Sequence, residues 1–234
     1  MDTQTRHALK GDKFAQATKT SVTWLTGHRV GVVRWSIAGA VVIVLVLGGL
    51  IYWSLQSSAA EAALGAAMDA YTTPLAEPGA PPLHGEYATT AERSKAANKE
   101  FLAVADKYGW LAAGAKAHYF AGVTYEDIGQ SGPAEAELKK AESAGSRNLS
   151  NLAKLALASL YRQTGRDAQA IDAYKALIAK PSTTVPATVA ELNLADLYST
   201  SGKREQARVL WAKVRDADKN GAAGSIAAQK LAGQ

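Results

Sequence analysis

The second half of the chain repeats itself three times. Segments that begin at His118, Lys154 and Glu191 align without internal gaps, at spacings of 36 and 37 residues. A repeat of this length suits one helical hairpin, and a single hairpin must stack on a neighbour to bury its apolar side. The repeated positions hold a tyrosine (Tyr125, Tyr161, Tyr198), a glycine (Gly129, Gly165, Gly202), an alanine (Ala134, Ala170, Ala207) and a large residue (Leu138, Tyr174, Trp211).

The spacing within one repeat predicts two packed helices. In the first repeat, Gly122 and Tyr125 lie three apart and so share a helix face. Gly129 follows, where the chain needs a permissive backbone to turn back. Ala134 then allows close approach of the second helix, and Leu138 fills the space one turn later. We therefore predict an all-α fold, a solenoid of α-α hairpins with about three clear repeats and one degenerate repeat.

This pattern resembles the tetratricopeptide repeat, over about 105 residues of the chain. Its leucine, small-residue, tyrosine, alanine and aromatic positions are matched. The opening large position departs from the family pattern, since it holds His118, Lys154 and Glu191. The second alanine survives only as Ala141, and Pro181 alone lies near the place of the final proline. The resemblance implies a protein-binding module.

An uncharged segment precedes the repeats. Residues 37–53 are all apolar or glycine, and the aromatic residues Trp35, Tyr52 and Trp53 flank this core. About 20 helical residues cross a bilayer, so we predict a transmembrane helix at 35–56. A cleaved signal peptide is the alternative, because small residues that suit cleavage follow the span. Its apolar region would, however, be shorter than the one seen here.

The positive charge of the chain is concentrated ahead of the span. Residues 1–34 hold six basic and two acidic residues, whereas the residues after the span hold 20 basic and 19 acidic ones. The first basic residue beyond the span is Arg93. We therefore expect a cytoplasmic tail and an exported C-terminal domain. A nucleic-acid-binding domain is not expected, because such a domain carries its cations on its folded body.

Two further regions complete the predicted organisation. Residues 57–110 form a degenerate repeat, in which a helix continues the span, a Pro-rich loop follows, and Ala97 and Phe101 repeat the alanine-then-aromatic spacing. Residues 111–234 hold the clear repeats and a capping helix that starts near Gly224. Within the tail, residues 13–28 form either a helix on the membrane surface or a mobile segment that only sets topology.

The layout of a basic tail, one span and an exported repeat domain resembles the ancillary subunit of the bacterial Sec translocon. This resemblance implies the inner membrane, a periplasmic domain, and partners among translocon subunits, a membrane-anchored folding factor or exporting chains. Tyr174 begins a segment with the character of that family's C-terminal repeats. The alternative is a periplasmic adaptor for cell division or envelope assembly. Outer-membrane assembly lipoproteins are excluded, because they need a cysteine and the chain has none.

No constellation of catalytic residues is apparent in the sequence. The four histidines have no metal-ligand spacing, and no nucleophile elbow, phosphate loop or dinucleotide turn is present. His118 is interpreted as a packing or surface residue. Two carboxylate pairs, Glu126 with Asp127 and Glu135 with Glu137, are interpreted as solvated surface. We therefore expect no enzyme activity, no cofactor, no metal and no small-molecule substrate.

Protein binding by such arrays uses the concave face, which the first helices of the hairpins line. Carried over from the tetratricopeptide family, the concave positions form a mixed, partly apolar set that suits a partner helix or an extended apolar segment. The alternative is that these residues only pack against neighbouring hairpins. The predicted protein-binding residues are Tyr119, Val123, Glu126, Leu155, Ser159, Arg162, Leu192, Asp196 and Ser199.

Overall fold

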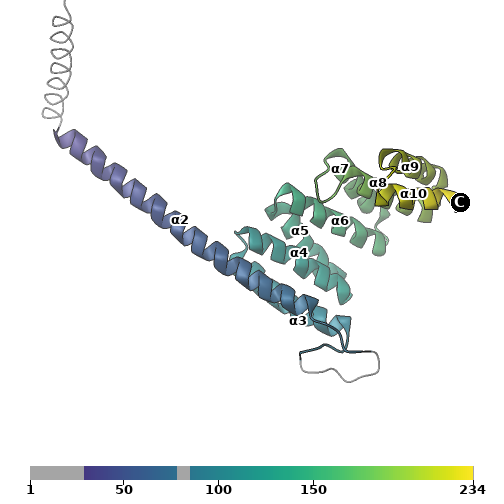
Figure 1. The fold of residues 1–234 in the computed structure, drawn as a ribbon, viewed down its shortest axis with the longest axis horizontal. Coiled ribbons are helices and arrows are strands. Elements are labelled where there is room, and N and C mark those ends of the chain that lie inside the picture. The colour runs from purple at the N-terminus through teal and green to yellow at the C-terminus, as the bar shows by residue number, and fades with distance from the viewer. Residues whose placement is uncertain (1–28, 78–84, 234) are drawn as a thin grey trace, which may run out of the picture. The chain divides into compact units, whose positions relative to one another are not determined.

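Helices make up most of the computed structural model, which describes residues 29–77 and 85–233. Within those ranges it holds nine helices and no β-strand, so the predicted all-α class is confirmed (Figure 1). A single isolated bridge joins Leu75 to Tyr87 in the Pro-rich connection. The helices are α2 (Arg29–Thr72), α3 (Thr90–Tyr108), α4 (Ala112–Asp127), α5 (Ser131–Ala144), α6 (Arg147–Gln163), α7 (Asp167–Ala179), α8 (Ala187–Thr200), α9 (Arg204–Ala217) and α10 (Ala222–Ala232).

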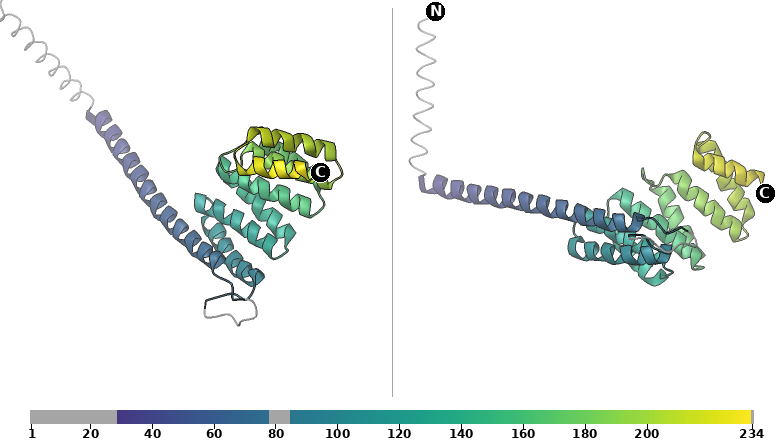
Figure 2. Two further views of the ribbon diagram at one scale, coloured as in Figure 1. Left: turned by 45° about the vertical axis from the view of Figure 1, so that its right-hand side comes forward. Right: turned by 60° about the horizontal axis from the view of Figure 1, so that its bottom comes forward.

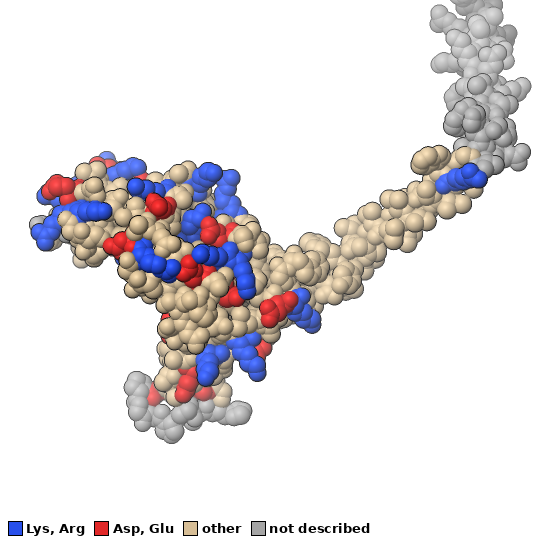
Figure 3. All heavy atoms as spheres, turned by 180° about the vertical axis from the view of Figure 1, so that it is seen from behind, with Lys and Arg blue, Asp and Glu red and all other residues tan. Residues whose placement is uncertain are grey.

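The chain divides into two compact units after Leu55, within α2. In the first unit, every described side chain from Val33 to Leu55 is exposed. This part of the helix carries no acidic side chain, and its one described basic residue, Arg34, lies near its start (Figure 3). The helix is long and apolar enough to cross a membrane. The basic tail and the possible helix at 13–28 lie outside the described residues.

The second unit is a stack of helical hairpins (Figure 2). Residues 56–72 of α2 pack against α3. Three antiparallel pairs follow, namely α4 with α5, α6 with α7, and α8 with α9. The last helix, α10, packs on α9 and α8. Residues 57–72, predicted to continue the span, lie in the same helix α2, and α10 lies where the capping helix was predicted. Figure 3 shows acidic and basic side chains intermixed over the surface of the repeat helices.

The repeat positions do the packing that their spacing predicts. The turn glycines Gly129, Gly165 and Gly202 have φ angles of 75°, 72° and 77°, in the left-handed region that glycine adopts most readily. At Gly122, an added Cβ would lie 2.6 Å from Cγ of Leu138, so α4 and α5 approach too closely there for a larger residue. The alanine and large-residue positions are buried in all three repeats, and so are Ala97 and Phe101 of the first hairpin.

Candidate protein-binding groove

The nine predicted groove residues come in threes from the first helices of the hairpins. Helices α4, α6 and α8 each contribute three positions, and all nine side chains are partly buried, neither enclosed in the core nor fully exposed. Helices α4 and α6 contact each other directly. The array therefore supplies three parallel rows, one at each helical position, that cross neighbouring helices.

The first row is apolar. Tyr119 and Leu155 pack against one core cluster that also holds Leu157 and Tyr174, and Leu192 packs against the C-terminal cluster. The Tyr119 ring meets Phe120 edge to face, with 5.2 Å between the ring centroids. Burial raises the pKa of the Tyr119 hydroxyl, with a smaller effect of the Glu126 carboxylate. This row therefore forms an apolar strip, part of whose surface is already packed against the protein's own core.

The middle row ends at a residue that is already engaged. Asp196 on α8 accepts hydrogen bonds at 3.2 Å from the indole Nε1 of Trp211 and at 3.2 Å from Nζ of Lys230 on the capping helix α10. Val123 and Ser159 occupy the same position on α4 and α6. Access to this row is therefore greater over α4 and α6 than over α8.

The third row holds two of the three charged groove residues, Glu126 and Arg162. Arg162 on α6 forms no ion pair among the described residues, and Ser199 follows on α8. Oxygen Oε1 of Glu126 on α4 is buried and has no hydrogen-bond partner within the described chain. Burial, aided by the charge of Asp127, raises the pKa of Glu126 to about 7.

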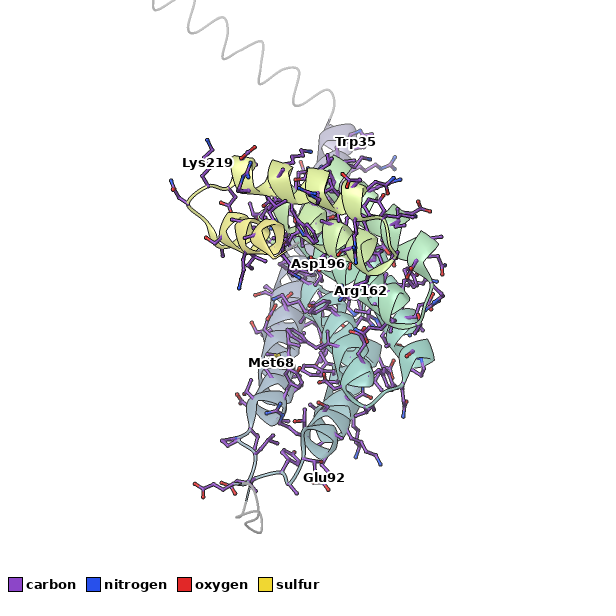
Figure 4. All side chains as sticks on the ribbon, turned by 90° about the vertical axis from the view of Figure 1, so that its right-hand side faces the viewer. Trp35, Met68, Glu92, Arg162, Asp196 and Lys219 are labelled. Atoms are coloured by element: carbon purple, nitrogen blue, oxygen red, sulfur yellow. The ribbon has the colours of Figure 1, made fainter. Side chains whose placement is uncertain are left out.

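One core residue presents a polar atom close to this charged row. The hydroxyl of Tyr174 is buried and has no hydrogen-bond partner within the part of the chain that the structure describes. Burial raises the pKa of Tyr174, the Ser159 side chain and the charge of Arg162 lower it, and Asp196 raises it, so Tyr174 lies close to three of the predicted groove residues. Figure 4 labels Arg162 and Asp196 on the neighbouring helices α6 and α8.

The interpretation of the carboxylate pairs as solvated surface agrees with the exposed Asp127 but is wrong for Glu137. Glu137 is buried, with His118 Nδ1 at 2.6 Å and Lys140 Nζ at 2.7 Å. Burial would raise the pKa of Glu137, but the hydrogen bonds from His118 and Lys140 outweigh burial and lower it. Glu135 binds Arg166 and Lys139, each at 2.7 Å. His118 and Arg166 come from other parts of the chain, so a single-helix pattern does not reveal these contacts.

The same contacts explain the departure from the tetratricopeptide pattern at the opening position. His118 meets Glu137, Lys154 meets Glu142 at 3.2 Å, and Glu191 meets Lys213. Each of the three residues is thus ion-paired or hydrogen-bonded to a second helix of a hairpin. A signal for these pairs was present in the sequence, because a position that is large and apolar in the family is titratable here in all three repeats.

A buried polar cluster between α3 and α4 was not predicted. The amide of Asn98 donates to the carbonyl of Ala121 at 3.0 Å and to Oγ1 of Thr124 at 2.9 Å. Oγ of Ser94 donates to Asp127 at 2.7 Å. Ser94, Asn98 and Thr124 are all buried. These bonds satisfy polar groups inside the interface between α3 and α4.

Comparison with known proteins agrees with this geometry. A tetratricopeptide-repeat family profile matches residues 153–179, which cover most of α6 and all of α7. A search of curated proteins found no match. Among the described residues, no group of three or more His, Asp or Glu side chains is arranged to hold a metal ion. The chain is therefore a tetratricopeptide-like protein, whose repeats indicate interaction with other proteins, preceded by one helix able to span a membrane.

Proposed function

We propose that this chain is a non-enzymatic scaffold, anchored by 35–56 in the bacterial inner membrane, that binds proteins with its periplasmic domain at the exit of the Sec translocon. The observation that carries the proposal is the pairing of one exposed apolar helix with a hairpin array whose first helices keep nine side chains partly accessible. The basic tail favours a cytoplasmic N-terminus. Partners are translocon subunits, a membrane-anchored folding factor or exporting chains.

The proposed topology has a direct test, because the chain lacks cysteine. A single Lys95→Cys variant of the full chain should react with a membrane-impermeant maleimide in cells whose outer membrane is permeable. A single Thr5→Cys variant should react only after the inner membrane is opened. The reverse pattern would place the repeat domain in the cytoplasm and end the proposal. A mature protein whose mass is lower by that of the tail and the span would favour the cleaved signal peptide.

The partner is tested by photo-crosslinking of the full chain in living cells. A photoreactive residue at Tyr119, in the apolar row, and one at Leu47, in the span, should capture translocon subunits or exporting chains. A probe at Ala136, exposed on α5, is the matched control and should not capture them. Arg162→Glu should weaken the capture at Tyr119 without unfolding, since Arg162 has no ion pair to lose. Capture of division or wall-synthesis proteins instead would favour the envelope adaptor.

A further inference from the structure

A pocket of about 520 Å³ lies between helices α7 and α9, with α8 as its floor. Ile178 comes from α7, Leu194 from α8, and Val209 and Leu210 from α9. Val209 is 68% exposed and presents an apolar side chain at the mouth of the pocket. The pocket has the volume of a typical binding site and an apolar lining.

The corresponding place one repeat earlier is not apolar. Glu142 from α5 forms an ion pair there with Lys154 from α6, at 3.2 Å. Because the repeats align without gaps, the two places can be compared residue by residue. The side chains at the two places therefore differ in character. The earlier counterparts are Glu142 for Ile178, Asp172 for Val209 and Ala173 for Leu210.

Two lysines and two glutamates line the pocket, and of these Lys175 and Glu205 have no ion pair among the described residues. Lys139, one repeat earlier, has Glu135 at 2.7 Å, four residues before it on the same helix. The same place before Lys175 holds Ile171, and Lys175 has no ion pair among the described residues. Of the other rim charges, Lys213 is paired with the buried carboxylate of Glu191. The rim acid Glu205 lies in the first turn of α9, where the helix dipole favours it.

We infer that this pocket, hereafter the α7–α9 pocket, binds an amphipathic helix of a partner protein that carries an acidic residue beside its apolar face. The walls are helices whose backbone groups are bonded within themselves, so they offer a partner's backbone few hydrogen bonds. A partner segment that buries its backbone here must satisfy its own N–H and C=O groups, and a helix does so. Its acidic side chain finds Lys175, which supplies charge complementarity.

The α7–α9 pocket is separate from the predicted groove and does not depend on the proposed translocon role. The two surfaces use different sides of α8, so occupation of one leaves the other accessible. A scaffold with both could hold two partners at once. The pocket uses Glu191, Leu194 and Tyr198 of α8, whereas the predicted groove uses Leu192, Asp196 and Ser199.

The test uses the full chain in lipid nanodiscs and a fluorescent helical peptide of about four turns, with leucines at helical spacing and glutamates flanking them. A second peptide has lysine in place of each glutamate. Wild-type protein should bind the acidic peptide more tightly, as measured by anisotropy. Val209→Asp should weaken that binding by roughly tenfold or more, because it places a charge on the apolar lining. Lys175→Glu should reverse the preference between the two peptides.

Asp172→Asn is the matched control, because Asp172 holds the position of Val209 one repeat earlier and should leave peptide binding unchanged. Both residues are exposed, so neither substitution should alter the circular dichroism spectrum. Equal binding of the two peptides, or equal binding by wild type and Val209→Asp, would overturn the inference. A photoreactive residue at Val209 that captures mainly a second copy of the chain, or lipid, would also overturn it.

Discussion

The first hairpin and the later repeats reach the same packing by different means. In the later repeats, three residues separate α4 from α5 or α6 from α7, and a glycine with positive φ sets each turn. In the first hairpin, residues 73–89 separate α2 from α3. Both regions nevertheless bury an alanine and, four residues later, a large ring, as Ala97 with Phe101 and Ala170 with Tyr174.

The two regions also differ in their contacts. A short turn fixes how two helices cross, whereas a long connection constrains them little. The first hairpin has directional contacts within itself and to α4. Phe101 stacks on Phe120 with 5.3 Å between centroids, Tyr71 meets Phe101 edge to face at 6.1 Å, and Asn98 binds across to α4. We infer that the polar cluster fixes the register between α3 and α4.

The largest loss of stability is expected at the buried-ring position that the first hairpin and the later repeats share. Phe101→Ala and Tyr174→Ala each remove a fully buried ring from the same position of the repeat. Each should lower the free energy of unfolding by about 3–5 kcal/mol, through lost burial and an unfilled cavity. Guanidinium unfolding of the full chain in detergent micelles, followed by circular dichroism, measures both. Val209→Ala, at an exposed site, is the control and should change stability by less than about 0.5 kcal/mol.

The two substitutions also test whether the first hairpin belongs to the array. A loss below about 1 kcal/mol for Phe101→Ala, with a full loss for Tyr174→Ala, would mean that the first hairpin does not share the packing rule of the later repeats.

The next largest loss of stability is expected only at the contact between the first hairpin and α4. Asn98→Ala removes the donor to Ala121 and Thr124 and leaves buried acceptors without it. The free energy of unfolding should fall by about 1–3 kcal/mol. Asn193→Ala is the matched control, because the Asn193 amide bonds only to Val189 on its own helix, at 2.8 Å. Equal losses for the two variants would remove the register argument.

A smaller loss of stability is expected at the glycine turns, which only the later repeats have. Gly165→Ala forces alanine to adopt a φ of 72° and should cost about 1–2 kcal/mol of unfolding free energy. Gly65→Ala is the control, because Gly65 lies in the interior of α2, is exposed and is free of neighbours within 4 Å. The control should stabilise the protein by roughly 0.5–1 kcal/mol. Stabilisation by both substitutions would show that the turn tolerates a side chain.

The solenoid could be predicted because its information is local and repeated. The spacing from Tyr161 to Gly165 to Ala170 sets one hairpin by itself, and three copies of the spacing exclude chance. The break at the prolines and the helix that continues the span follow from propensity and charge alone. The apolar helix is equally local, since its length and its lack of charge are visible in the sequence.

The electrostatic environment of the candidate groove could not be predicted from the same pattern. Whether Glu126 meets water depends on how α4 sits among its neighbours, and Glu137 needs His118 from another helix. The α7–α9 pocket has a sequence signal that self-comparison can reveal, since Val209 replaces Asp172 at one repeat position. That signal gains meaning only once α7 and α9 are known to flank α8 with a pocket between them.

The remaining contrast is between two carboxylates, Glu126 and Glu137, and it concerns how stability depends on pH. The folded-state pKa of Glu126 is raised from an ordinary 4.5 to about 7, so the folded protein holds this proton at pH values where the unfolded chain has lost it. Stability should therefore fall as pH rises between these two values, and level off above them. Glu126→Gln should remove that fall, measured as the difference between the two unfolding curves at each pH.

Glu137→Gln should show the opposite sign, because the pKa of Glu137 is lowered in the folded state. The ionised Glu137 contributes stability at pH values above its ordinary pKa, and this contribution is lost as pH falls through the lowered value. The two variants together distinguish two kinds of carboxylate. Glu126 has a buried oxygen without a hydrogen-bond partner in the described chain, whereas Glu137 is bonded to His118 and Lys140. A difference between wild type and Glu126→Gln that stays constant with pH would mean that water reaches the Glu126 carboxylate, and that the third row of the groove is open to solvent.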